Sequence, residues 1–376
     1  MLPRDSFFLF GPRGTGKTWL LRAHFGDACW FDLLDQRELL RIHQSPAYFE
    51  EAVCARPRDQ WVVVDEIQRA PQLLDVAHRL IEMRGQRFVL TGSSARKLKR
   101  GAANLLAGRA ILRNLFPLTF AEYRGHASLD DVLSFGSLPG VLLDPDRERR
   151  VDRLTAYASM YLAEEIKAEA LTRNLGAFSR VLTVAALATG QVTNLANVAR
   201  ESGVSRSTVS SYFSILEDTL IGAFLPAWQP RVRMKEVQHA KFYLFDCGVY
   251  RALIDRVRDA PSAQEKGVLF ETCVFHELRA AVAYRNVGGT LSYWRTHDGT
   301  EVDFVWQRGK RVVGIEAKAS DSWRPEYGRG LEALGARVKG KFLGVYRGER
   351  ELKTSHYRVL PVETFLARLA RGDFFQ

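Results

Sequence analysis

Near the start of the chain, Gly11-Pro12-Arg13-Gly14-Thr15-Gly16-Lys17-Thr18 follows the apolar run Phe7-Phe8-Leu9-Phe10 and precedes a run, Trp19 to Ala23, with a helical pattern. A buried strand, a glycine-rich loop and a helix therefore come in the order of a phosphate-binding loop. The glycines let the backbone curl, so that successive N–H groups and the helix N-terminus point at phosphate oxygens. The alternative is an ordinary glycine turn before a helix, which the order of the elements disfavours.

The ligand expected for this loop is ATP with Mg²⁺. Lys17 is expected on the β and γ phosphates, and the Thr18 hydroxyl on the metal ion. The expected nucleotide-binding residues are Gly11, Pro12, Arg13, Gly14, Thr15, Gly16, Lys17, Thr18 and Trp19.

A second apolar strand, residues 61–64, ends in two acids. Asp65 is expected to hold the shell of the Mg²⁺, and Glu66 to polarise the attacking water as a catalytic residue. A solvated strand end is the alternative, but the strand lies some fifty residues after the loop, as an ATPase of this class requires. The sequence therefore predicts an acidic pair beside the phosphates.

A third apolar strand, residues 88–90, ends in hydroxyl side chains. This strand is expected beside the strand that carries the two acids, where a hydroxyl can touch the γ phosphate or the water. Ser93 is the favoured sensor; Thr91, Ser94 and a plain turn remain alternatives.

Two more apolar runs, residues 29–33 and 110–115, bring the number of expected strands in this region to five. Helical patterns link them. The sequence therefore predicts an α/β fold with a doubly wound, mainly parallel sheet.

Four parts of the sequence together resemble a family of prokaryotic AAA-type P-loop ATPases. They are the glycine-rich loop, Val64-Asp65-Glu66, the segment 90–94, and Leu106-Ala107-Gly108-Arg109 followed by residues 116–120. Members usually carry a C-terminal domain of unknown function. The resemblance spans most of the chain and implies ATP hydrolysis. It also implies that Arg109 completes a neighbouring subunit's site in trans, which requires a homo-oligomer; Arg113 is the runner-up, and a surface or salt-bridging role for Arg109 stays open.

Three domains are expected, over residues 1–125, 126–235 and 236–376. The middle domain looks helical from about 130 to 190, and residues 195–217 have the pattern of a helix-turn-helix. Extended segments at 223–228 and 241–245 would supply the wing of a winged helix. In a DNA reader the second helix would offer Arg206, Ser207, Thr208 and Ser211. A structural lid or a protein-binding domain is the alternative.

The C-terminal region reads as a helix with acids at 269–278 followed by a β-hairpin, 301–306 and 312–318. Strand alternation places Glu316 and Lys318 on one face, which Asp303 on the partner strand can approach. The set resembles the PD-(D/E)xK core of an α+β, restriction-endonuclease-like fold. This resemblance implies Asp303, Glu316 and Lys318 as catalytic residues, and Glu271, Asp303 and Glu316 as metal ligands. Charge pairing across a hairpin, or a fold that only binds, is the alternative.

Charge and composition bear on partners and location. Lys and Arg outnumber Asp and Glu by 54 to 43, a net charge of +11, which favours a polyanion such as DNA. Solvated arginines on helix faces would give the same excess. The four cysteines are widely spaced, which suggests reduced thiols in the cytoplasm, and no apolar run approaches the roughly 18 residues of a membrane span.

The resulting hypothesis is ATP hydrolysis coupled to action on DNA. The alternative is a nucleotide-dependent signalling or scaffold switch whose C-terminal module binds without catalysis.

Overall fold

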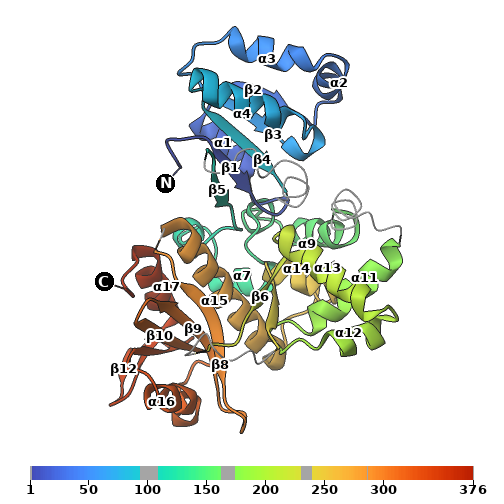
Figure 1. The fold of residues 1–376 in the computed structure, drawn as a ribbon. Helices are drawn as coiled ribbons and strands as arrows, with labels where there is room; N and C mark the ends of the chain where they lie inside the picture. The colour runs from blue at the N-terminus through green and yellow to red at the C-terminus, as the bar shows by residue number, and fades with distance from the viewer. Residues whose placement is uncertain (1, 94–108, 162–173, 230–238, 286, 376) are drawn as a thin grey trace. The chain divides into compact units, whose positions relative to one another are not determined.

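The computed structural model describes residues 2–93, 109–161, 174–229, 239–285 and 287–375, which group into two compact units (Figure 1). The first unit holds the described chain up to Phe116, together with Asp218–Ile221, and the second holds the described remainder from Pro117 onward. A compact unit can contain more than one domain. The domain boundaries expected at residues 125 and 235 therefore remain predictions.

The first unit contains a five-stranded parallel sheet with the order β2-β3-β4-β1-β5. This confirms the expected parallel α/β sheet and the position of β4 beside β3. Its strands are β1 (Phe7–Phe10), β2 (Cys29–Asp32), β3 (Val62–Asp65), β4 (Phe88–Gly92) and β5 (Ile111–Asn114). Its helices are α1 (Lys17–His24), α2 (Gln36–Gln44), α3 (Pro46–Cys54), the 3₁₀ turn η1 (Ile67–Arg69) and α4 (Leu73–Arg84).

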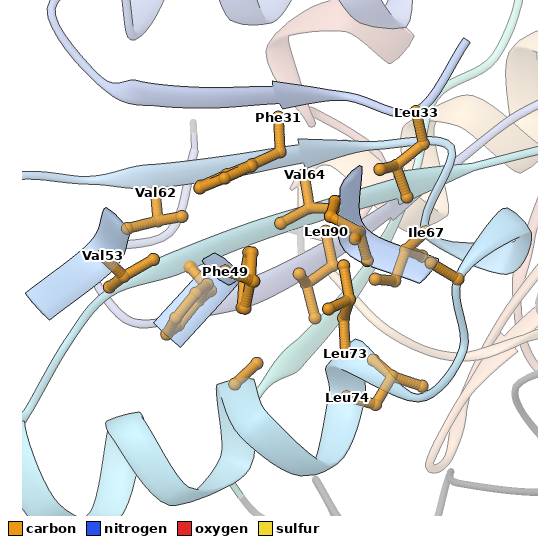
Figure 2. Close-up of a cluster of buried hydrophobic side chains, with 14 of the residues drawn as sticks. Phe31, Leu33, Phe49, Val53, Val62, Val64, Ile67, Leu73, Leu74 and Leu90 are labelled. Carbon is orange, nitrogen blue, oxygen red and sulfur yellow. The ribbon is translucent and has the colours of Figure 1, made fainter. Parts of the chain in front are cut away.

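Both faces of this sheet are buried, which explains why its strands read as continuous apolar runs. Val62 and Val64 of β3 point into a core with helices α2, α3 and α4, whereas Val63 points to the core on the face of α1. Figure 2 shows the larger core, in which the ring of Phe49 on α3 lies 4.7 Å from the ring of Phe31 on β2. The layered core fixes the strand ends at one edge of the sheet, where the polar residues lie.

The second unit begins with helices and a two-stranded antiparallel hairpin. The helical character expected for residues 130–190 is confirmed in the described part; Leu162 and Ile166, expected on its apolar stripe, lie outside the described residues. The elements are α6 (Phe120–Tyr123), α7 (Leu129–Phe135), α8 (Pro139–Leu142), α9 (Arg147–Ala156), the π turn η2 (Tyr157–Tyr161), α11 (Leu175–Leu187), α12 (Leu195–Ser202), α13 (Arg206–Asp218), β6 (Gly222–Leu225), β7 (Lys241–Leu244) and α14 (Cys247–Leu253).

A six-stranded mixed sheet, ordered β12-β13-β11-β10-β9-β8, completes the second unit. The expected helix and hairpin are confirmed as α15, β9 and β10. A core of apolar side chains joins one face of the sheet to α16. The elements are α15 (Ala263–Arg285), β8 (Thr290–Arg295), β9 (Glu301–Arg308), β10 (Arg311–Lys318), η3 (Pro325–Gly328), α16 (Arg329–Gly335), β11 (Lys341–Tyr346), β12 (Leu352–Lys353), β13 (Arg358–Pro361) and α17 (Val362–Arg371).

Within the described ranges, no helix has both the length and the hydropathy of a membrane span.

Two buried acids join segments of the second unit that are distant in sequence. Asp246 accepts hydrogen bonds from the backbone N–H groups of Ser137, at 2.6 Å, and Val249, at 2.9 Å. Glu277 of α15 accepts one from the N–H of Phe120, at 2.6 Å. Burial raises the pKa of Asp246 to about 6 and that of Glu277 to about 8. The folded chain therefore holds the Glu277 proton at neutral pH.

We expect Glu277→Gln to remove a pH dependence of stability. Because the pKa of Glu277 is about 8 in the folded chain and about 4.5 in the unfolded chain, the folded state binds the extra proton between these values. This contribution to the free energy of unfolding is present below pH 4.5 and is lost as the pH rises toward 8. As the pH rises through this window, the free energy of unfolding of the variant should therefore increase relative to that of the wild type by a few kcal/mol, at about 1.4 kcal/mol per pKa unit.

Urea unfolding at a series of pH values measures the difference. Glu51→Gln, an exposed acid of α3, is the matched control and should give a flat difference. A flat difference for Glu277→Gln as well would contradict the assignment.

Candidate active sites

The glycine-rich loop adopts the curled shape that its sequence predicts. Gly14 and Gly16 have φ angles of 83° and 88°, in the left-handed region that favours glycine. At Gly11, a Cβ atom would lie 2.4 Å from the carbonyl oxygen of Leu115, so any side chain would force the loop away from the end of β5. Helix α1 then begins at Lys17, which presents its free N–H groups at the loop.

Lys17 lies inside its own loop. Its Nζ donates to the carbonyl oxygens of Gly11, at 2.7 Å, and Pro12, at 3.2 Å, and the side chain is buried. The Thr15 hydroxyl also donates to the Pro12 carbonyl, at 2.9 Å. Trp19, which was expected to bind nucleotide, is 75% exposed on the first turn of α1. The loop carbonyls therefore hold the ammonium group of Lys17 without any contribution from Trp19.

Asp65, at the end of β3, is the centre of a hydrogen-bonded group. The Thr18 hydroxyl donates to its Oδ2 at 2.7 Å, and the Thr91 hydroxyl donates to its Oδ1. Asp65 is buried, so these two donors compensate for its lost hydration. A hydroxyl and a carboxylate in contact are the oxygen ligands that Mg²⁺ prefers, so Thr18 and Asp65 fit the ion expected there.

Glu66 and Ser93, both expected to be catalytic, are linked by Gln68. The Gln68 amide nitrogen donates to the carboxylate of Glu66 and to the hydroxyl of Ser93, the latter at 3.3 Å. Glu66 has a φ of 62°, a strained angle for a residue other than glycine. Burial raises its pKa, and the positive charge of Lys17 offsets part of that increase. Sequence reasoning missed Gln68, since a glutamine two residues after an acid carries no recognisable signal.

Arg109 has a partner within its own chain. Its Nε donates to the carboxylate of Glu82, on α4 of the same unit. The runner-up, Arg113, donates to the carbonyl of Leu112 at 3.1 Å. The role of Arg109 in trans remains a prediction. Ser94 and residues 106–108, which belonged to the expected motifs, lie outside the described residues.

In the second unit, the hairpin brings Asp303 of β9 to Glu316 and Lys318 of β10, as expected. The Nζ of Lys318 lies 2.5 Å from Oε1 of Glu316 and 3.5 Å from Oδ2 of Asp303. The N–H of Ala317 donates to Asp303 at 2.9 Å. Burial and the charge of Asp303 raise the pKa of Glu316 to about 8, although Lys318 opposes the shift.

Glu271 of α15 has different partners. The Lys241 Nζ lies 3.3 Å from its Oε1, and the Tyr243 hydroxyl donates to the same oxygen. Lys241 also forms an ion pair with Glu301. Burial alone would lower the pKa of Lys241. The negative charges of nearby carboxylates outweigh this effect and raise the pKa above its ordinary value; they belong to Glu271, Asp303 and Glu301. Burial and the charge of Asp303 raise the pKa of Glu271 to about 7.

The two lysines therefore divide four acids into two groups, one held by Lys241 and one by Lys318. Within the described ranges, no set of three or more His, Cys, Asp or Glu side chains is arranged to hold a metal ion. Glu271 is paired with Lys241, whereas Asp303 and Glu316 are paired with Lys318, and the three-acid metal site expected from Glu271, Asp303 and Glu316 remains a prediction. Sequence reasoning missed Lys241, Tyr243 and Glu301; a lone lysine in the apolar strand β7 was the available signal.

Helices α11, α12 and α13 precede the hairpin β6–β7, and Val192, between α11 and α12, forms an isolated antiparallel bridge with Lys241 of β7. Of the four residues expected to face DNA, Arg206, Ser207 and Ser211 are exposed. Thr208 is half-buried, and its hydroxyl is hydrogen-bonded to that of Ser205, at 2.8 Å.

Comparison with protein families divides the chain into three parts. Residues 3–124 match a family described as an AAA domain. Residues 126–260 and 266–365 match two domains of unknown function, DUF8612 and DUF4143. The first match supports a P-loop ATPase domain, with nucleotide binding and hydrolysis, and the last confirms the C-terminal domain of unknown function that the resemblance implied.

Several known proteins are similar over most of the chain. An uncharacterized protein of Mycobacterium tuberculosis is 26% identical over 354 residues, which cover 92% of this chain and 77% of that protein. An uncharacterized protein of Methanocaldococcus jannaschii is 21% identical over 345 residues, covering 84% and 75%. The structure of the Aeropyrum pernix ORC1 protein in complex with DNA aligns at a TM-score of 0.29 and 17% identity, covering 68% of this chain and 87% of that chain.

We expect Lys241→Met to destabilise the second unit by roughly 3–5 kcal/mol, because removing one partner of a buried ion pair leaves the other charge uncompensated. The exposed turn residue Lys310, substituted in the same way, is the matched control. Adding Glu301→Gln to Lys241→Met should recover part of the loss. Unfolding in urea measures all three variants, and a Lys241→Met protein as stable as the control would show that this lysine does not hold the acids together.

Proposed function

We propose that this protein binds and hydrolyses Mg-ATP in its first unit and uses the nucleotide state to control action on DNA. The observation that carries the first half is the contact between the Thr18 hydroxyl and Asp65, directly beneath a loop with left-handed glycines and a buried lysine. A hydroxyl, a carboxylate and a cation lie together where a triphosphate can reach all three.

Binding requires a change of partner for Lys17. With no phosphate present, the ammonium group is satisfied by the carbonyls of Gly11 and Pro12. Phosphate oxygens are stronger acceptors than neutral carbonyls, so the ammonium group turns to the β and γ phosphates. The loop amides and the N-terminus of α1 bind the remaining oxygens. Mg²⁺, when bound, neutralises charge on these phosphates.

Glu66 is the proposed base. Its carboxylate accepts a proton from the attacking water, and its raised pKa strengthens it for that task. The Gln68 amide donates both to the Glu66 carboxylate and to the Ser93 hydroxyl, so a change at the γ phosphate that moves Ser93 can reach Glu66 through Gln68.

We expect Lys17→Ala to lose ATP binding, because it removes the only side-chain cation proposed for the β and γ phosphates. Glu66→Gln should bind ATP with near wild-type affinity yet turn it over 10²–10⁴-fold more slowly, the usual contribution of a general base. Calorimetric titration and phosphate release measure the two steps. Glu51→Gln is the matched control. Normal turnover by Lys17→Ala would refute the site, and brisk turnover by Glu66→Gln would remove this acid from the mechanism.

Two features support DNA as the partner. The chain carries a net charge of +11, and α12, α13 and the β6–β7 hairpin come in the order of a winged helix, with Arg206, Ser207 and Ser211 exposed at the start of α13. Basic and hydroxyl side chains at a helix N-terminus suit base edges and phosphates. The alternative, a signalling or scaffold switch, requires no affinity for DNA.

The convergence of Asp303, Glu316 and Lys318 favours a second activity, cleavage of phosphodiester bonds. Lys318 is 30% exposed at its side chain, so a substrate can reach it, whereas both acids are nearly covered. The competing proposal is that these charges only bind.

We expect DNA binding that weakens steeply as the salt concentration rises, and cutting of DNA in Mg²⁺ or Mn²⁺ that disappears in Lys318→Ala. Lys310→Ala, on the exposed turn of the same hairpin, is the control. Binding without cutting would leave a non-catalytic module. Absence of salt-dependent binding would favour the signalling alternative.

A further inference from the structure

Five neighbouring strands of the C-terminal sheet carry a basic residue at the same end of the sheet. The residues are Arg308 at the end of β9, Arg311 at the start of β10, Lys341 at the start of β11, Arg358 at the start of β13 and Lys353 at the end of β12. We call these five residues the basic edge. All five are exposed.

The register of the sheet aligns these side chains. Arg311 pairs with Arg308, and Lys353 pairs with Arg358. Lys341 lies opposite Val313, two residues after Arg311. In the same way, Arg358 lies opposite Leu343, two residues after Lys341.

Residues that are paired across strands, or two apart along one strand, point to the same face of a sheet. All five side chains therefore share one face as well as one end. The residues next to them along the strands confirm this shared face, because they point to the opposite face, into the core against α16. These neighbouring residues are Val312, Phe342 and Val359.

The charges of the basic edge are not compensated by acids. Among the described residues, none of the five forms an ion pair. The nearby acids Glu351 and Asp373 are paired instead with Arg368 and Arg371. Like charges directly opposite each other in an antiparallel pair are destabilising, and this occurs at both Arg308–Arg311 and Lys353–Arg358. An anion lying across these strands would relieve the repulsion.

The size of the edge indicates a polyanion. Adjacent strands are about 4.8 Å apart, so five strands extend over roughly 19 Å. One strand of duplex DNA places a phosphate about every 3.4 Å along the axis, so five or six phosphates span this length. A pocket of about 630 Å³ opens on the same edge, between Lys341, Lys353, Arg358 and Arg368, with Phe342 and Phe374 in its lining. This hollow gives a backbone room to approach the cations.

The basic edge is distinct from the acidic site of the same sheet. Lys318 ends β10, whereas Arg311 begins it, and the seven residue steps of extended strand between them span roughly 23 Å. Asp303 and Glu316 each lie five residues along their strands from the basic edge, which is roughly 17 Å.

We propose that the basic edge binds the phosphate backbone of nucleic acid, without reading its sequence, and so anchors the C-terminal domain on DNA. This rests on the proposed action on DNA and adds a surface that α13 does not provide. Phosphate contacts made by lysine and arginine fix position and orientation, and each contributes to the salt dependence of binding.

The test is fluorescence anisotropy of the full chain on a labelled duplex of about 30 base pairs, at salt concentrations from about 50 to 200 mM. The triple variant Arg308→Gln, Lys353→Gln, Arg358→Gln removes three charges that make no described side-chain hydrogen bond, so folding should be preserved. The control triple variant, Arg124→Gln, Arg256→Gln, Arg329→Gln, removes the same charge from exposed residues of the same unit away from the edge.

We expect the edge variant to lower the slope of log affinity against log salt by about 3, at about 0.9 per phosphate contact, and to weaken binding more than tenfold at the lowest salt concentration. The control should keep the wild-type slope. Equal losses in the two variants, or none in the edge variant, would overturn the basic edge while leaving the proposed action on DNA in place. A wild-type chain with no salt-dependent binding would instead refute the action on DNA itself.

Discussion

The buried carboxylates of this protein require a donor or a cation within reach, and this requirement organises both units. An isolated carboxylate transferred from water to a protein interior loses far more free energy of hydration than packing returns. Asp65 accepts hydrogen bonds from two hydroxyls, and Asp246 accepts them from backbone N–H groups. Glu271 forms an ion pair with Lys241 and accepts a hydrogen bond from Tyr243. Except for Val249, each donor lies on a segment distant in sequence from its acid, so these contacts also set how the elements pack.

The same requirement explains the chemistry available at the two sites. In the first unit, the donors to Asp65 are neutral hydroxyls, which leave the negative charge in place for a cation. In the second unit, the donors are ammonium groups, which already neutralise the acids. The first arrangement suits a metal–nucleotide site, whereas the second holds its charges in balance within the chain.

The two ends of the C-terminal sheet differ in how their charges are paired. Acids matched by lysines lie near Glu301 and Lys318, and the unmatched cations of the basic edge lie at the opposite end. The second distribution costs stability through repulsion, whereas the first is internally compensated. A surface of uncompensated charge on a rigid sheet is suited to binding a polyanion, because the strands hold the cations in place before the partner arrives.

The sequence alone determined the parallel sheet, the loop at Gly11–Thr18, the acids at the end of β3 and the hairpin with Asp303, Glu316 and Lys318. These features depend on local order and on the two-residue period of a strand, which can be read along the chain. Only the tertiary structure decided that Gln68 joins Glu66 to Ser93, that Lys241 holds Glu271, and that five cations share one face of the sheet. Such contacts depend on strand register and on packing between distant segments, which hydrophobic periodicity does not specify.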